Sequence, residues 1–154
     1  MTTERKVLLA RPHAFIVADM KPLLAQAGFS PAPLSALEEI AGGAWRSAHG
    51  AVISIALSSS IPESAETVFA TLRRHAPRIP VLFAGLTDFE MARRTVERIV
   101  QPVEPKATVL PIDAGSEHHS GLGRPDVVLY LQKDTLKTAA GTALAERMLR
   151  RHFI

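Results

Sequence analysis

Short apolar runs alternate along the chain with longer stretches in which apolar residues recur every three or four positions. The first pattern is typical of buried strands, and the second is typical of helices with one buried face. Their alternation predicts an α/β fold in which parallel strands are joined by crossover helices. The expected strands are residues 7–10, 29–33, 51–57, 80–85 and 126–131, and the expected helices are residues 14–27, 35–48, 60–75, 87–100 and 135–152.

Several of the expected helices begin with a polar residue that can cap them. In a capping box, a hydroxyl residue is followed three positions later by glutamate, and the two side chains bind free backbone N–H groups at the helix start. This signature predicts where the middle three helices begin, and a similar cap is expected before the last helix. The pairs are Ser35 with Glu38, Ser60 with Glu63, and Thr87 with Glu90, and the last cap is Asp134 or Thr135.

Two other features refine the order of elements. Pro31 and Pro33 lack the N–H group that a central strand needs, so residues 29–33 are expected at a sheet edge. The pattern loosens over residues 101–125, where residues 107–112 could form an extra strand and residues 113–125 are rich in Gly, Ser and His. We interpret residues 101–125 as an insertion with a possible extra strand and a mobile loop. The chain, residues 1–154, is expected to form one domain.

Composition narrows the class of protein. With 154 residues, 47% of them hydrophobic and 21% charged, the chain is long enough to bury a substantial core and is not typical of a disordered protein. No apolar run approaches the roughly 20 residues of a membrane span, and residues 7–10 are too short for the apolar part of a secretory signal. The absence of cysteine excludes disulfides and thiolate sites. We therefore expect a cytoplasmic protein without membrane insertion.

The excess of basic residues raises the question of whether the protein binds nucleic acid. The net charge is +3 and the isoelectric point is about 9.7. Two of three arginine clusters alternate with glutamates at the four-residue spacing of solvated helix faces, and the large amphipathic rings, Trp45 and Tyr130, are expected on helix or core positions. We therefore do not expect direct binding of nucleic acid. The clusters are Arg73, Arg74 and Arg78; Arg93, Arg94 and Arg98; and Arg147, Arg150 and Arg151.

The order of elements and several short motifs resemble the receiver domain of two-component response regulators. The matching segments are KVLLA at residues 6–10, QAGF at 26–29, SSSIP at 58–62, LRR at 72–74, PRIPVL at 77–82 and YLQK at 130–133. The resemblance implies a doubly wound, flavodoxin-like sheet of five parallel strands with helices on both faces, here with an insertion before the last strand.

The residues that carry phosphotransfer in receivers are largely replaced. The family holds magnesium with two acidic residues after the first strand and accepts the phosphoryl group on an aspartate after the third. These positions match Arg11, Pro12 and Ser58. An arginine repels a cation that carboxylate oxygens should bind, and a serine hydroxyl cannot form an acyl phosphate. The resemblance therefore implies a degenerate receiver, or pseudo-receiver, that works without phosphorylation, without a metal or other cofactor, and without enzymatic activity.

The remaining switch residues match the family only in part. The hydroxyl residue that ends the fourth strand in receivers is Gly85 here, with Thr87 two positions later. Lys133 and Tyr130 match the lysine and the aromatic residue of the last strand, and Lys106 is an alternative for the lysine, although it precedes its strand.

Pseudo-receivers act as docking or dimerisation modules, so the resemblance implies a protein partner or a homodimer. The expected face comprises the helix at 87–100, the strand at 126–131 and the helix at 135–152, and its candidate residues are Arg93, Arg98, Tyr130 and Arg147. Tyr130 could instead be part of the core.

An alternative function uses the carboxyl ends of the strands, where doubly wound sheets bind ligands. Cationic and hydroxyl side chains beside helix N-termini could hold a phosphate, nucleotide or carboxylate, which would make the protein a small-ligand sensor. In the competing interpretation, Ser60 and Thr87 only cap helices while Arg11 fills the vacated magnesium pocket and pairs with Asp88. The candidate anion-site residues are Arg11, Pro12, Ser58, Ser59, Thr87 and Lys133.

Two further candidate sites, a metal site and a hydrolase triad, have weaker support in the sequence. A metal could bind the carboxylates and imidazoles of residues 113–119, but adjacent histidines in a flexible loop more often lie in solvent. A hydrolase triad could combine Ser58, His13 and Asp88, but no nucleophile-elbow glycines flank the serine. The metal candidates are Asp113, Glu117, His118 and His119.

Overall fold

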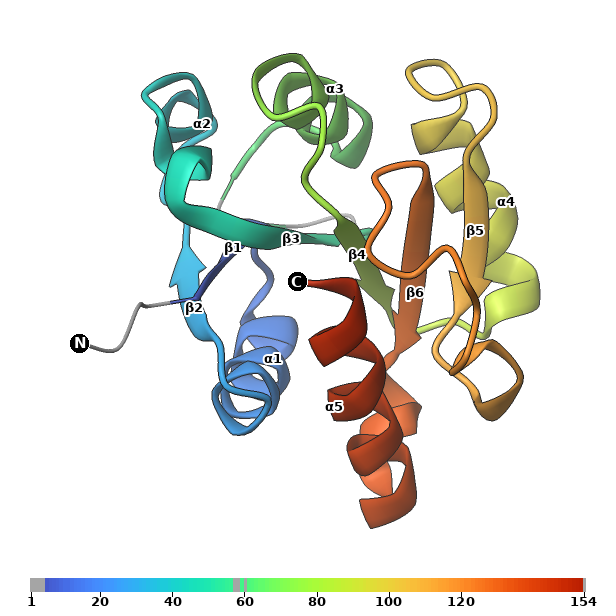
Figure 1. Cartoon of the computed structure of the whole chain (residues 1–154). Coiled ribbons are helices and arrows are strands. Elements are labelled where there is room, and N and C mark those ends of the chain that lie inside the picture. The colour runs from blue at the N-terminus through green and yellow to red at the C-terminus, as the bar shows by residue number, and fades with distance from the viewer. Residues whose placement is uncertain (1–4, 57–58, 60, 154) are drawn as a thin grey trace.

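The computed structural model describes residues 5–56, 59 and 61–153. It contains a six-stranded parallel sheet in the order β2-β1-β3-β4-β6-β5, with helices on both faces (Figure 1). The strands are β1 (Lys6–Arg11), β2 (Ser30–Pro33), β3 (Ala48–Ser54), β4 (Val81–Gly85), β5 (Thr108–Pro111) and β6 (Val127–Gln132). The helices are α1 (Ala14–Gln26), α2 (Glu38–Ala41), α3 (Ala65–His75), α4 (Phe89–Val100) and α5 (Ala139–His152), and short 3₁₀ helices span Ala44–Ser47, Ala114–Ser116 and Lys133–Lys137.

The central strands are apolar along almost their whole length because both faces of the sheet are covered. Successive side chains point to opposite faces, so each strand contributes to two cores. Leu8 and Phe83 pack in the core beneath α2, α3 and α4, whereas Leu9 and Leu82 pack in the core beneath α1 and α5. The predicted doubly wound α/β fold is confirmed.

The insertion adds a sixth strand to the expected five. Its residues 108–111 form β5, which pairs in parallel with β6 and lies at the edge of the sheet. The segment that follows packs against the end of α5, where Gly123 N–H donates to His152 Nδ1 at 3.0 Å and Arg147 binds Glu117 at 2.6 Å. β5 therefore covers the strand that would form the edge of a five-stranded sheet. The mobility expected for residues 113–125 stays a prediction.

The expected start of the first helix at residue 14 is confirmed, whereas the starts of the later helices are wrong by one to several residues. The predicted caps Thr87 and Thr135 are displaced by Asp88 and Thr138, whose side chains accept N–H groups of Met91 and Gly141. The cap of α3 is Ser64, which accepts from Thr67 N–H, while the expected cap Ser60 lies outside the described residues. Neighbouring polar residues give similar local signals, and packing of the helix decides which of them becomes the cap.

The expected helix at 35–48 is also wrong. Only Glu38–Ala41 is α-helical, and a 3₁₀ helix follows at Ala44–Ser47. Gly43 adopts a positive φ of 98°, which ends the α-helix. The chain therefore enters β3 through a tight turn.

The beginning of the last helix is more exposed than expected. Ala139, Ala140 and Ala143 are exposed, because α5 begins four residues later than expected and only its second half lies on the sheet. The buried residues of this helix are Ala145, Met148, Leu149 and His152.

Candidate functional site

The side chain of Arg11 lies at the carboxyl ends of β1 and β3 and is only 5% exposed. Its Nη1 donates to the carbonyl oxygens of Ser54 at 2.9 Å and Ala56 at 2.5 Å, and its Nε donates to the carbonyl oxygen of Glu63 at 3.0 Å. These bonds join the end of β1 to the segment between β3 and α3. The guanidinium therefore fills the space at the strand ends and holds this segment in place.

Arg11 also places a fixed positive charge where the family resemblance implies magnesium ligands. Burial lowers the pKa of its guanidinium and the charge of Glu66 raises it, but arginine stays protonated in proteins. A divalent cation at this position would be repelled by the guanidinium. The expected ion pair with Asp88 is not formed, because Asp88 caps α4 instead.

Pro12 and Ser59, which lie beside Arg11, add hydrogen bonds but carry no negative charge. Pro12 is buried, and its carbonyl oxygen accepts a short hydrogen bond from the Ser59 hydroxyl. Ser59 Oγ also accepts the N–H of Ile61 at 3.1 Å. Ser58 and Ser60 lie outside the described residues. Ser59 therefore acts with Arg11 to attach the segment before α3 to the end of β1.

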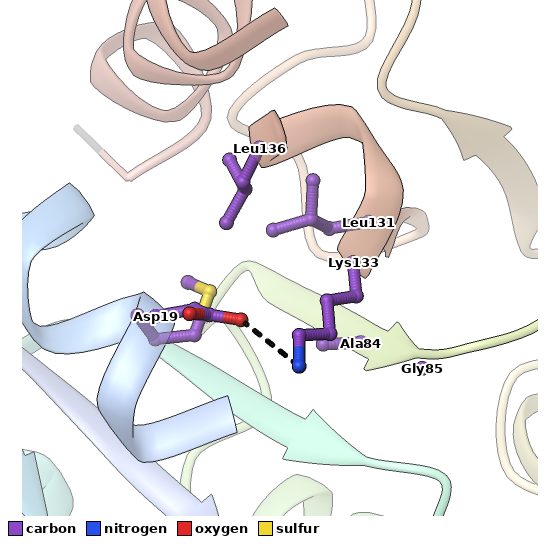
Figure 2. Close-up of a pocket in the computed structure, with 7 residues that line it drawn as sticks. Asp19, Ala84, Gly85, Leu131, Lys133 and Leu136 are labelled. Atoms are coloured by element: carbon purple, nitrogen blue, oxygen red, sulfur yellow. Dashed lines mark ion pairs between the residues drawn. The ribbon is translucent and has the colours of Figure 1, made fainter. Parts of the chain in front are cut away.

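Lys133 follows β6 and reaches toward α1. Its Nζ lies 3.9 Å from Asp19 Oδ2, and the two side chains face each other across a small hollow above the ends of β4 and β6 (Figure 2). The hollow has a volume of about 10 Å³, which is room for about one water molecule. It is too small for a nucleotide. Lys106 precedes β5 and therefore lies toward the opposite end of this parallel sheet.

Tyr130 is turned into the core. It is 1% exposed, its hydroxyl donates to the Thr87 carbonyl oxygen at 2.6 Å, and its ring lies 6.4 Å from that of Phe89. Burial raises the pKa of its phenol above the ordinary value. A Cβ at Gly85 would lie only 2.8 Å from the Tyr130 hydroxyl, so the absence of a side chain there accommodates the inward position. Tyr130 is therefore part of the core, which was the second of its two expected positions, and it does not lie on the exposed docking face.

The other three candidate residues of the docking face do not lie together. Arg93 and Arg98 are exposed on α4, and Arg93 pairs with Glu97 at 3.6 Å. Arg147 is on α5, which packs on the opposite face of the sheet from α4 (Figure 1). Because β5 lies at the edge beside β6, α4 and α5 do not form the continuous face expected from five strands.

Two apolar residues that the sequence analysis did not single out lie near the start of α4. Leu86 is 59% exposed and Met91 is 67% exposed. Large apolar side chains that remain this exposed near one another can mark a surface for protein contacts. Their signal in the sequence was their position, because Leu86 follows a buried strand and Met91 falls between the buried positions of an amphipathic helix.

The metal candidates do not assemble among the residues that the structure describes, and Ser58 of the hydrolase candidate lies outside those residues. In that part of the chain, no group of three His, Asp or Glu side chains is placed to hold a metal ion. Glu117 binds Arg147, and His119 Nδ1 accepts the N–H of Gly121. Within the same residues, no helix is long and apolar enough to cross a membrane.

Comparison with known proteins agrees with this architecture. No family model matches the sequence, and no curated protein matches it. The structure is similar to one described as "Crystal structure of response regulator receiver protein from Sinorhizobium medicae WSM419", with a TM-score of 0.54 and 20% sequence identity. The similarity covers 96% of this chain and 97% of that chain. At this level of identity the likeness shows the fold, and the chain therefore has a flavodoxin-like, receiver-like fold.

Proposed function

We propose that this protein is a receiver-like signalling module that works without phosphorylation and acts through protein contacts. The main support is Arg11, whose guanidinium binds three backbone carbonyl oxygens at the strand ends. Phosphorylation of a receiver requires a carboxylate nucleophile and a bound magnesium ion. The family's acidic positions carry Arg11, Pro12 and Ser58 here, so this region supplies a cation in place of the ligands for one.

The proposed contact surface is the outer side of α4, which we call the α4 face and define by Leu86, Met91, Arg93 and Arg98. All four side chains are exposed. Apolar residues would supply the buried centre of an interface and the arginines its charged rim. The α4 face is narrower than the surface expected from the sequence, because Tyr130 is buried and Arg147 lies on the other layer.

Labelling with acetyl phosphate tests independence from phosphorylation. The purified protein is incubated with radiolabelled acetyl phosphate and magnesium, beside a receiver that retains its acidic residues. We expect label on the control receiver and none on this chain. Magnesium should also leave the fluorescence of Trp45, the sole tryptophan, unchanged. Magnesium-dependent labelling of this chain would contradict the proposal.

Sedimentation velocity tests the α4 face for a second copy of the chain. The wild type is compared over a concentration series with the variants Leu86→Asp/Met91→Asp and Arg93→Glu/Arg98→Glu. We expect both variants to weaken association, because they place charge in the apolar centre or reverse the rim. Arg150→Glu on α5 is the control. A wild type that stays monomeric excludes the homodimer, and a partner captured equally well by the wild type and both variants excludes the α4 face.

The small-ligand sensor predicts a different response. An anion bound at the strand ends would raise the melting temperature in proportion to its affinity and concentration. Thermal unfolding with a panel of phosphates, nucleotides and carboxylates separates the two functions. We expect no specific shift, because Arg11 is bound to carbonyl oxygens and the hollow beside Lys133 has the size of one water molecule. A specific shift that Arg11→Met abolishes would favour the sensor.

A further inference from the structure

An open groove lies at the amino ends of β3 and β4, at the opposite end of the strands from Arg11. One side is formed by the 3₁₀ helix Ala44–Ser47 and the start of β3, and the other by the turn between α3 and β4. Its volume is about 660 Å³, which is enough for several side chains. We call it the Trp45 groove and define it by Trp45, Arg46, His49, Pro77, Arg78 and Ile79.

The Trp45 groove has an apolar wall in which an aromatic ring is already positioned. Trp45 is partly buried and packs against the edge of the core, so its ring is held by the fold. The Arg46 guanidinium lies 5.6 Å from the centre of that ring, which is within cation–π distance. Tryptophan and arginine are the residue types that most often dominate the energy of protein interfaces.

The charge of the groove is positive and not balanced locally. Arg46 and Arg78 are exposed on its rim, and neither forms an ion pair with any residue that the structure describes. In the same part of the chain, no acidic side chain lines the groove. Arg93, Arg124 and Arg147 differ from these two residues, because each pairs with a carboxylate. The groove is therefore complementary to an acidic ligand.

We propose that the Trp45 groove binds an acidic peptide segment of a partner protein. Apolar side chains of the segment would pack on Trp45, Pro77 and Ile79, while its carboxylates would pair with Arg46 and Arg78. A single-stranded nucleic acid fits less well, because it needs large aromatic rings for successive bases and Trp45 is the one Phe, Tyr or Trp residue that lines the groove in the described chain. The proposal depends neither on the α4 face nor on the loss of phosphorylation.

Peptide display provides the test. Random dodecapeptides are selected on the wild-type protein, on Arg46→Glu/Arg78→Glu and on the matched control Arg94→Glu/Arg150→Glu. Both variants change the net charge equally and replace exposed arginines, but the control residues lie on α4 and α5, outside the Trp45 groove and the α4 face. The best peptide is then synthesised and titrated against each protein while Trp45 fluorescence is recorded. Circular dichroism verifies that all three proteins are folded.

We expect the wild type and the control to enrich peptides that combine Asp or Glu with apolar residues. The selected peptide should change Trp45 fluorescence, and its affinity should fall about tenfold or more in Arg46→Glu/Arg78→Glu. The proposal is overturned if no peptide is enriched, if the enriched peptides are neutral or basic, or if Arg46→Glu/Arg78→Glu retains them. Tighter binding of oligo-dT than of the peptide would replace it with a nucleic-acid site. Loss of peptide binding in the control alone would place the binding outside the Trp45 groove and overturn the proposal.

Discussion

At the level of single residues, the two buried arginines, Arg11 and Arg73, have a structural role. Arg11 binds carbonyl oxygens at the carboxyl ends of the strands, and Arg73 does the same near their amino ends. Arg73 is 5% exposed and donates to the carbonyl oxygens of Ala76, Ile79 and Pro125 at 3.3, 2.6 and 2.8 Å. Both arginines donate to backbone carbonyl oxygens that are buried or partly buried.

Replacement of Arg73 should destabilise the protein strongly. Its Nε lies 3.5 Å from Glu104 Oε1, within ion-pair distance but outside hydrogen-bond geometry, and its guanidinium lies 5.1 Å from the Phe69 ring. Arg73→Met would remove the donors from three carbonyl oxygens and lower the free energy of unfolding by about 3 kcal/mol. Arg73→Lys should cost less, because it keeps the charge but not the planar set of donors. Urea denaturation measures the free energy of unfolding of both variants. An equal loss of stability in Arg73→Met and Arg73→Lys would argue against a role for guanidinium geometry.

A side chain at Gly85 should compete with Tyr130. The family's hydroxyl residue, introduced as Gly85→Ser, would place Cβ about 2.8 Å from both the Tyr130 hydroxyl and Ile55 Cγ1. Crowding of this kind costs about 1–3 kcal/mol. Tyr130→Phe removes one of the colliding atoms, so the double variant should be more stable than the sum of the two single effects predicts. A strictly additive double-mutant cycle in urea would contradict this coupling.

At the level of elements, proline residues remove outward-facing N–H groups from both edge strands of the sheet. The N–H groups of Ser30 and Leu34 donate to β1, at Arg5 and Leu9 respectively. Backbone N–H groups alternate in direction along a strand, so positions 31 and 33 face away from β1, and both are proline. β5 repeats the arrangement, because Thr108 and Ile112 donate toward β6 and Pro111 faces outward. An edge without these donors resists the addition of another strand.

The variant Pro31→Val/Pro33→Val should therefore associate through β2. It restores two outward N–H groups and raises β propensity, so we expect a concentration-dependent increase in light-scattering mass that the wild type does not show. Ala32→Val is the matched control, because it also adds a β-branched residue but lies at the position whose N–H faces β1. Equal scattering by the control and the double variant would contradict the edge argument.

At the scale of the whole molecule, His152 connects the last helix to distant parts of the chain. It is fully buried, and burial lowers its pKa from 6.5 to about 4. Its Nδ1 accepts the N–H of Gly123, so Nε2 carries the proton and donates to the Val81 carbonyl oxygen at 3.2 Å. The neutral ring thus joins α5, β4 and the insertion. The sequence holds a signal for this role, since His152 continues the buried spacing of Ala145, Met148 and Leu149.

This histidine should make stability depend on pH. The unfolded chain binds a proton at His152 near pH 6.5, whereas the folded protein resists protonation until about pH 4. The contribution is therefore complete above pH 6.5 and is lost as the pH falls toward 4, by about 3 kcal/mol in total. His152→Gln should flatten the unfolding free energy within this window. An unchanged slope in chemical denaturation measured across these pH values would rule out His152 as the cause.

The sequence by itself determined the fold class, the order of elements, the proline edge at residues 29–33 and the replacement of acidic residues by Arg11 and Pro12. These features depend on local periodicity and on the chemistry of single residues, which can be read along the chain. They were also enough to place a possible extra strand within the insertion, although its position at the sheet edge was not apparent.

Packing between distant segments determines where the later helices begin and what the candidate residues contact. The partners of Arg11 lie 43 to 52 residues away, and Tyr130 reaches a carbonyl oxygen 43 residues away. The separation of Arg147 from α4, like the Trp45 groove, depends on how distant segments pack. Contacts of this range are set by close packing of the whole core, and local sequence patterns carry no information about which distant atoms will meet.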